Sequence, residues 1–238
     1  MADALLSIQG VFAGYEGQSV LNNISFDVPE GSLITLLGPN GHGKTTVLRC
    51  ISGLVKPTKG QIEFDGKRID GMEAERIVAR GVVMIPQGDM LFPEMSVYDN
   101  LRMGAYLKQA NAAFEQNVEE IYTLLPRLKE RTSQMARTLS GGERRMLAIG
   151  RGLLAGGRIL MLDEPSLGLA PIVIDQMYEI IKDLKAQGRT ILLVEENASR
   201  IIDLAERIHL VDTGTIVWDG GGKELQSNPQ VLETYLGG

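Results

Sequence analysis

The chain has 238 residues, 44% of them hydrophobic, so it is long enough to bury the core of a full α/β unit. Its 24 basic and 30 acidic residues give a net charge of -6, so we expect no nucleic-acid partner. The only cysteine is Cys50, which excludes an internal disulfide and fits a reducing compartment.

The amino-terminal part of the chain has β character. Residues 5–15 (LLSIQGVFAGY) and 20–28 (VLNNISFDV) alternate apolar and polar side chains, and Gly17 and Gln18 are expected in the turn between them. Residues 60–66 (GQIEFDG) are a third segment of this kind, bounded by glycines. Together these segments predict a small antiparallel sheet.

The remaining strands read as continuous apolar runs, which is typical of a sheet buried on both faces by helices. The first run, SLITLLG, leads into a helix predicted from Lys44 to about Ile51, with Gly53 as its stop. Further strands are predicted at residues 81–86, 158–163, 190–195 and 207–212. The order of strand, loop and helix predicts a doubly wound α/β core with a mostly parallel sheet.

Residues 94–157 interrupt this pattern with helical periodicity and no strand. We therefore predict a single domain over residues 1–238. Residues 1–93 and 158–238 form its core together with the antiparallel subdomain, and residues 94–157 form an inserted helical subdomain. The first ten residues lack the layout of a signal peptide, and no apolar run reaches the roughly 18 to 20 residues that cross a bilayer. We expect a cytoplasmic chain that meets a membrane only through a partner.

Residues 38–46, GPNGHGKTT, match the phosphate-loop (Walker A) pattern after a strand and before a helix, and this context predicts a nucleotide site. Lys44 is expected to reach the β- and γ-phosphates, and the Thr45 hydroxyl to bind Mg²⁺. The side chain of His42 is expected to graze the phosphates or solvent. The predicted nucleotide-binding residues of this loop are Gly38, Pro39, Asn40, Gly41, His42, Gly43, Lys44, Thr45 and Thr46.

The strand RILMLD ends in Asp163, followed directly by Glu164. A phosphate loop needs a carboxylate at the end of a neighbouring strand to hold its metal, and Asp163 fills that role. Strand alternation points Glu164 elsewhere, toward the position of a water in line with the γ-phosphate. Glu164 is therefore the predicted catalytic base.

Residues 138–150, TLSGGERRMLAIG, place Ser140 and Glu143 in capping-box spacing at the start of a helix whose amides, at Gly141 and Gly142, are open to an anion. The segment LSGGE, taken together with the phosphate loop and the DE strand, resembles the signature of the ABC-transporter ATPases, and the resemblance covers the whole chain. It implies that Ser140, Gly141, Gly142 and Glu143 contact ATP held by the phosphate loop of a second ATPase subunit.

The same resemblance assigns two further residues. Tyr15 stands where that family stacks an aromatic ring on adenine, and Gln87 matches the loop glutamine that contacts Mg²⁺ and the attacking water. It also implies integral-membrane permease subunits, docked near Phe92, Pro93 and Met95, and a peripheral location on the cytoplasmic face of the membrane.

The runs PEMSVYDNLRMGAY, SLGLAP and LLVEENA resemble the ATPases of branched-chain amino-acid importers, with Ala170 where the wider family usually has aspartate. This resemblance implies ATP-driven import of these amino acids, a periplasmic or extracellular solute-binding protein as an indirect partner, and two ATPase subunits. A heterodimer is preferred to a homodimer. The alternatives are an importer of urea or short amides, a soluble ABC ATPase without a transport role, and an inactive subunit paired with an active one.

The strand TILLVE ends in Glu195, and Glu196 stands where most ABC ATPases carry a histidine that donates to the γ-phosphate. An ionised glutamate only accepts hydrogen bonds and is repelled by a triphosphate. Four roles are open for Glu196. It is protonated and acts like glutamine, or it faces a lysine, a water or the partner subunit. Alternatively, it slows hydrolysis, or it points into solvent without a role. We include it among the candidate catalytic residues.

Overall fold

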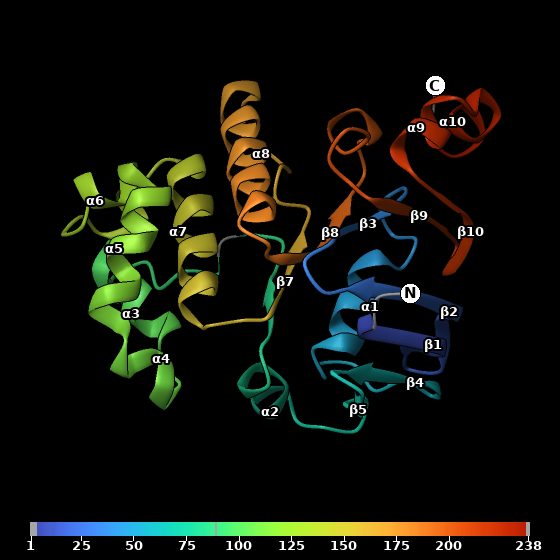
Figure 1. Cartoon of the computed structure of the whole chain (residues 1–238), viewed down its shortest axis with the longest axis horizontal. Helices are drawn as coiled ribbons and strands as arrows, with labels where there is room; N and C mark the ends of the chain where they lie inside the picture. Colours follow the sequence, from blue (N-terminus) through green and yellow to red (C-terminus); the bar gives the residue numbers. More distant parts are fainter. Residues whose placement is uncertain (1–3, 89, 237–238) are drawn as a thin grey trace.

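The computed structural model describes residues 4–88 and 90–236, which form two sheets and the helices around them (Figure 1). The larger sheet has six strands in the order β10-β9-β3-β8-β7-β6, all parallel except β10, which pairs antiparallel with β9. Its strands are β3 (Leu33–Leu37), β6 (Val82–Ile85), β7 (Ile159–Asp163), β8 (Thr190–Glu195), β9 (Arg207–Asp212) and β10 (Thr215–Gly220).

The smaller sheet is antiparallel, with the strand order β2-β1-β4-β5. The alternation in the first part of the sequence correctly predicts three of these strands, but Gln18 already belongs to β2, so Glu16 and Gly17 make the turn. The strands are β1 (Ala4–Tyr15), β2 (Gln18–Pro29), β4 (Lys59–Phe64) and β5 (Lys67–Arg68).

The central strands of the larger sheet are buried on both faces, which explains their uninterrupted apolar sequences. In β3, Leu33 and Leu37 belong to the core on the side of the helices, whereas Ile34 and Leu36 belong to the core shared with the smaller sheet. Helix α1 (Lys44–Ile51) contributes its buried apolar residues to this second core, so it lies between the two sheets; they are Val47, Leu48, Cys50 and Ile51. Cys50 is a buried small side chain, and burial raises the pKa of its thiol to about 12.

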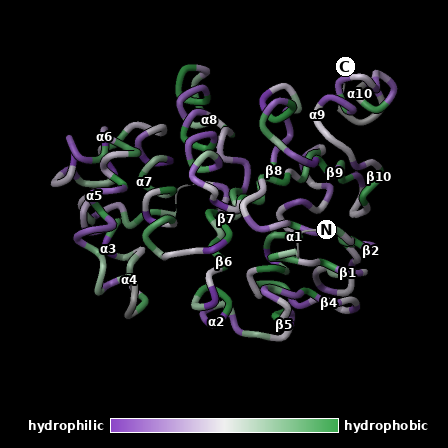
Figure 2. Tube along the Cα trace, viewed as in Figure 1, coloured by the Kyte–Doolittle hydropathy of each residue, from purple (hydrophilic) through white to green (hydrophobic). Residues whose placement is uncertain are grey.

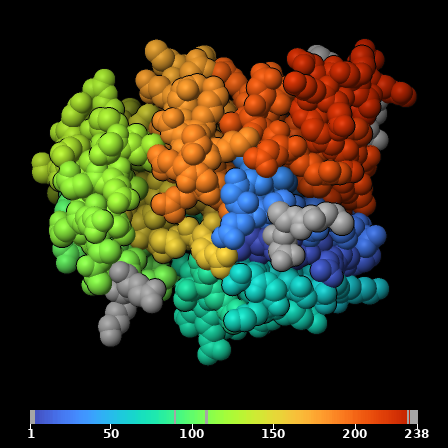
Figure 3. All heavy atoms as spheres, viewed as in Figure 1, coloured from blue at the N-terminus to red at the C-terminus, as the bar shows by residue number. Residues whose placement is uncertain are grey.

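The segment between β6 and β7 is helical, and it occupies one end of the molecule, drawn in green and yellow-green in Figure 3. Its described residues form no strand, and their β pairing is limited to an isolated bridge between Ser96 and Met135. The limits proposed for a helical subdomain, residues 94–157, stay a prediction. The helices are α3 (Val97–Gly104), α4 (Lys108–Ala112), α5 (Phe114–Leu124), α6 (Pro126–Glu130), η1 (Ala136–Thr138) and α7 (Gly141–Leu154).

The remaining helices flank the larger sheet or follow it. Helices such as α8 switch repeatedly between hydrophilic and hydrophobic residues along their turns, as expected of helices with one face against the sheet (Figure 2). None of the helices in the described part of the chain has both the length and the apolar character needed to cross a bilayer. These elements are α2 (Ala74–Ala79), α8 (Pro171–Ala186), η2 (Ala198–Arg200), α9 (Gly222–Gln226) and α10 (Pro229–Leu236).

Candidate functional site

The phosphate loop, residues 38–46, leaves the carboxyl end of β3 and opens helix α1, as the sequence predicts. Gly38, Gly41 and Gly43 all have positive φ, at 150°, 83° and 104°, which glycine adopts without strain. At Gly38 a Cβ atom would lie 2.2 Å from the carbonyl oxygen of Val211, so no other residue fits there. The glycines therefore shape a turn that exposes backbone amides at the start of a helix.

Lys44 is almost fully buried inside this loop. Its Nζ donates to the carbonyl oxygens of Gly38 at 2.7 Å and Pro39 at 2.9 Å, and it lies 3.4 Å from Oε1 of Glu164. The ammonium group is thus held by acceptors that a phosphate group could replace.

Asp163 ends β7 beside the loop, and its Oδ1 accepts a hydrogen bond from the Thr45 hydroxyl at 3.0 Å. Its other oxygen, Oδ2, is buried and has no hydrogen-bond partner among the described residues. Burial raises the pKa of this carboxyl, although Thr45 opposes the shift. A hydroxyl and a carboxylate with a spare oxygen are the hard donors that Mg²⁺ prefers, so these two residues fit the metal expected from the sequence.

Glu164 lies next to Lys44, and its Oε2 accepts from Nε2 of Gln87 at 3.4 Å. The sequence argument assigned its direction to strand alternation, but β7 ends at Asp163 and Glu164 adopts a left-handed φ of 45°. This turn, rather than continued strand geometry, separates the two carboxylates. Burial raises the pKa of Glu164, and the positive charge of Lys44 opposes this increase.

The side chain of His42 is 34% exposed, so it reaches solvent, and its Nδ1 also lies 2.6 Å from Oδ1 of Asp212 at the end of β9. This contact with Asp212 is not part of the sequence-based expectation. The amide of Gly214 also donates to the carbonyl oxygen of His42 at 3.0 Å. The phosphate loop is therefore fastened to the β9–β10 turn.

Tyr15 ends β1 with 40% of its surface exposed, and its hydroxyl accepts from Nη1 of Arg49 at 3.3 Å. Arg49 lies on helix α1, which the phosphate loop opens, so the ring is held close to this helix. Its stacking on adenine stays a prediction.

The two glutamates at the end of β8 have different surroundings. Glu195 is 2% exposed and accepts from the hydroxyl of Ser166 through both carboxylate oxygens, at 2.9 and 3.2 Å. Glu196 is exposed, and its Oε2 accepts from Nδ2 of Asn40 in the phosphate loop at 2.8 Å. The contact with Asn40 is absent from the sequence-based alternatives for Glu196.

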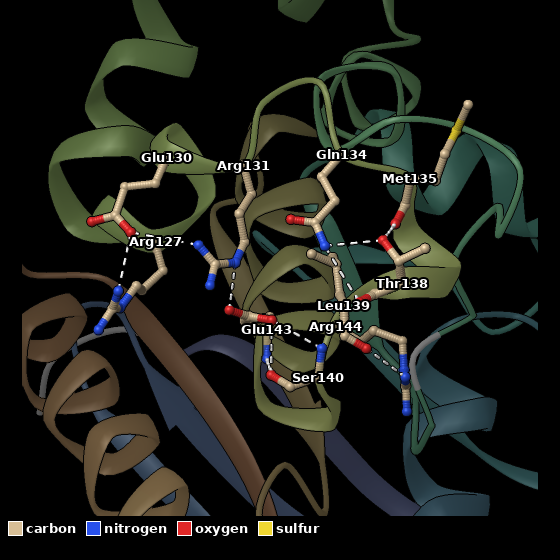
Figure 4. Close-up of polar contacts among 10 residues, drawn as sticks. All are labelled: Arg127, Glu130, Arg131, Gln134, Met135, Thr138, Leu139, Ser140, Glu143 and Arg144. Carbon is tan, nitrogen blue, oxygen red and sulfur yellow. Dashed lines mark hydrogen bonds and ion pairs between the residues drawn. The ribbon is translucent and has the colours of Figure 1, made fainter.

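Ser140 caps helix α7 in the predicted capping box (Figure 4). Its Oγ accepts from the amide of Glu143, and its own amide and hydroxyl donate to Oε2 of Glu143, both at 2.9 Å. Arg131 lies 2.6 Å from the other carboxylate oxygen of Glu143. Burial opposes ionisation here, but the hydrogen bonds from Ser140 and the charge of Arg131 lower the pKa of Glu143 overall.

The structure brings the phosphate loop, Gln87 and Glu164 together around one pocket of 360 Å³, next to Asp163 and Glu196. Residues 140–143 do not line that pocket within the described part of the chain. Ser140, Gly142 and Glu143 line a separate pocket with Arg127 and Arg131.

Arg145 is a site residue that sequence reasoning missed. It is buried on α7, and its Nη1 donates to the carbonyl oxygens of Pro86 at 3.2 Å and Gly88 at 3.0 Å, on either side of Gln87. Its partners are backbone atoms far away in the sequence, so no local pattern identifies it. Arg145 thereby connects α7, the helix that begins within the LSGGE segment, to the loop that carries Gln87, here called the glutamine loop.

Comparisons with known proteins agree with this geometry. A family model described as ABC transporter matches residues 21–167. The high-affinity branched-chain amino acid transport ATP-binding protein BraG of Pseudomonas aeruginosa is 39% identical over 234 residues, which cover 98% of this chain and 100% of BraG. LivG of Salmonella typhimurium, which carries the same description, is 33% identical over 253 residues, covering 100% of this chain and 99% of LivG.

Solved structures give the same fold. The ADP conformation of MJ1267, an ATP-binding cassette of an ABC transporter, has a TM-score of 0.85 and 26% identity, and each chain covers 100% of the other. A nucleotide-free ATP-binding cassette from an ABC transporter has a TM-score of 0.84 and 26% identity over 97% of this chain and 98% of its own.

Proposed function

Since the chain belongs to the ABC transporter family, and is an ATPase, we propose that it energises import of branched-chain amino acids through a membrane permease. The full-length similarity to BraG and LivG supports this substrate class. The observation that carries the proposal is the convergence of the phosphate loop, Asp163 and Glu164 at one edge of the parallel sheet.

Each polar group in this pocket has a role that follows from its position. When ATP binds, Lys44 exchanges the carbonyls of Gly38 and Pro39 for the β- and γ-phosphates. Release of Lys44 also frees Glu164, which is buried and whose raised pKa suits a general base. Glu164 takes a proton from the attacking water, and Gln87 helps to orient that water.

Thr45, Asp163 and Gln87 are the residues that would hold Mg²⁺. The partnerless Oδ2 of Asp163 supports this assignment. The ion supplies positive charge that offsets the charge developing on the phosphate oxygens. Tyr15 provides an aromatic surface for the adenine ring, with Arg49 fixing its hydroxyl.

A second ATPase subunit completes the site. Ser140, Gly141 and Gly142 do not line the phosphate pocket of their own chain, which supports action on ATP held by the partner. Glu143 serves this contact indirectly, because its carboxylate fixes Ser140 at the cap of α7. We prefer a heterodimer with a related ATPase.

The permease would dock on an apolar groove beside the glutamine loop. Met90, Phe92, Met103 and Tyr106 line it, with exposed fractions of 69%, 42%, 43% and 57%. Asn100 fixes the loop at its rim by bonding to both the amide and the carbonyl of Phe92. The neighbouring Pro93 and Met95 extend this surface.

This docking would hold the chain on the cytoplasmic face of the membrane. A periplasmic or extracellular solute-binding protein would deliver the amino acid to the other side.

Steady-state Mg²⁺-ATP hydrolysis across protein concentration tests the enzymatic part, with Glu164→Gln as the control. We expect a rate that rises more steeply than linearly with concentration, because two subunits form each site, and that vanishes in the control. ATP binding without hydrolysis at any concentration would mean that a homodimer is not competent, so the experiment would be repeated with the partner ATPase.

Uptake of labelled leucine, isoleucine and valine tests the substrate. Removal of the gene should abolish uptake, and the wild-type chain, but not Glu164→Gln, should restore it. Unchanged leucine uptake with loss of urea uptake would overturn the substrate assignment while leaving the ATPase assignment intact.

A further inference from the structure

The buried carboxylate of Glu195 lies at the junction of two functional loops. Its carbonyl oxygen accepts from the amide of Gly38, the first residue of the phosphate loop, at 3.3 Å. Its side chain accepts from Ser166, which lies in the catalytic loop, here defined as residues 164–170. One residue at the end of β8 therefore contacts both loops.

The catalytic loop needs such support because Glu164 has a left-handed backbone. For a residue with a side chain, this conformation is strained and persists only when the surrounding structure enforces it. The amide of Glu164 donates to the carbonyl of Val194 at 3.0 Å, and the amide of Leu167 donates to the carbonyl of Glu164 at 3.2 Å. The bond from Ser166 to Glu195 adds a tie to the same end of β8.

A charged group is costly to bury without partners, and Glu195 is 2% exposed. Ser166 is the residue whose hydroxyl reaches both of its oxygens. A bond from a hydroxyl to a carboxylate is stronger than one between neutral groups and fixes both partners.

We propose that Glu195 is a positioning residue for ATP hydrolysis, which acts through Ser166 to hold the catalytic loop so that Glu164 faces the phosphate loop. Glu195 is not among the described residues that line the phosphate pocket, so it acts through Ser166 and not on the nucleotide. The inference rests on the proposed ATPase site, but it assigns a task to a residue that this mechanism does not use.

The test compares Ser166→Ala with a matched control, Ser32→Ala. Ser32 is 3% exposed and its hydroxyl donates to the carbonyl of Pro29 at 2.6 Å, before the amino end of β3. Each change removes one hydroxyl that has a hydrogen-bond partner, and Ser32 is the more buried of the two, so Ser32→Ala should lose at least as much stability as Ser166→Ala. Only Ser166→Ala should lower kcat, by about tenfold, with the KM for ATP within twofold of wild type.

Two further variants test the link to Glu195. Ser166→Thr retains the hydroxyl and should recover most of the lost kcat. Glu195→Gln keeps an oxygen that can accept from Ser166, so it should lower kcat less than Ser166→Ala does. The double variant should be no slower than Ser166→Ala alone, because without the Ser166 hydroxyl the change at Glu195 has no bond left to weaken.

Hydrogen exchange at the amides of Glu164, Leu167 and Leu169 gives a readout that needs no hydrolysis. Exchange should be about tenfold faster in Ser166→Ala than in wild type and unchanged in Ser32→Ala. Unchanged exchange, or equal kcat losses in the two alanine variants, would overturn the inference. A wild type that hydrolyses no ATP even with its partner ATPase would contradict the proposed ATPase function, and faster exchange in Ser166→Ala would then still support the bond between Ser166 and Glu195.

Discussion

Because Lys44 and Glu164 form a buried ion pair, we expect a double-mutant cycle in the nucleotide-free chain to show that the two residues stabilise each other. Their side chains are 3% and 6% exposed and lie 3.4 Å apart. Lys44→Met keeps the length of the aliphatic stem but removes the charge, so Glu164 becomes a buried carboxylate without its cation. Glu164→Gln removes the opposite charge and leaves Lys44 bonded to Gly38 and Pro39.

The 3.4 Å distance between the charges of Lys44 and Glu164 sets the size of the expected coupling energy. At an effective dielectric constant of about 20, two unit charges this far apart attract by about 5 kcal/mol before the cost of burying them is counted. Loss of one partner of a buried pair typically costs about 3–5 kcal/mol. We expect Lys44→Met to lower the free energy of unfolding by about 3 kcal/mol when Glu164 is present and by about 1 kcal/mol in Glu164→Gln.

Urea unfolding of the four chains at neutral pH, without nucleotide, measures this coupling. A coupling of about 2 kcal/mol would show that the two charges stabilise each other before ATP enters. Strict additivity of the two single changes would refute this reasoning, because it would mean that the charges do not interact in the folded state.

Three other outcomes follow from the structure. Burial lowers the pKa of His209 from 6.5 to about 4, so the unfolded chain takes up the proton first as pH falls, and about 2 kcal/mol of stability is lost between pH 7.5 and 5. Urea unfolding should find this part of the pH dependence missing in His209→Gln; an identical slope would contradict it. Glu196→Gln should hydrolyse ATP as fast as wild type or faster, since an amide can donate to phosphate, and a drop in kcat beyond tenfold would make the carboxylate a participant. Asp163→Asn should lower Mg²⁺-dependent hydrolysis at least a hundredfold while metal-free ATP binding survives; near-normal hydrolysis would remove Asp163 from the metal site.

The parts of the fold that the sequence predicts best are those where burial alone decides the structure. The strands at residues 190–195 and 207–212 and the helix at 44–51 match the structure to the residue, because continuous apolar runs or a helical pattern have clear ends there. Strand β10 was not predicted, since its apolar residues, Ile216, Val217 and Trp218, are consecutive and form too short a run to mark a buried strand. The short helix α2 was missed as well, with one buried residue, Ile77, to mark its inner face.

In the functional site, too, only the features that a local sequence pattern determines could be predicted. Motif order was sufficient to predict that the phosphate loop, Asp163 and Glu164 lie together, because the carboxyl ends of parallel strands meet at one edge of a sheet. The environments of His42 and Glu195 could not be read in this way. Asp212 approaches His42 from 170 residues along the chain, and Ser166 approaches Glu195 from 29, through contacts that only the folded backbone creates.

Strand β8 ends at Glu195, whose backbone and side chain contact two loops, and this limits how the strand can change. Leu37 pairs with Glu195, and Val194 pairs with Asp163. Because successive side chains of a strand point to opposite faces, shifting β8 by one residue would place Glu195 on the face of its neighbour. Substitutions within β8 can be absorbed by repacking of the core. An insertion or deletion of one residue would instead break the contacts of Glu195 with the catalytic loop and the phosphate loop at the same time.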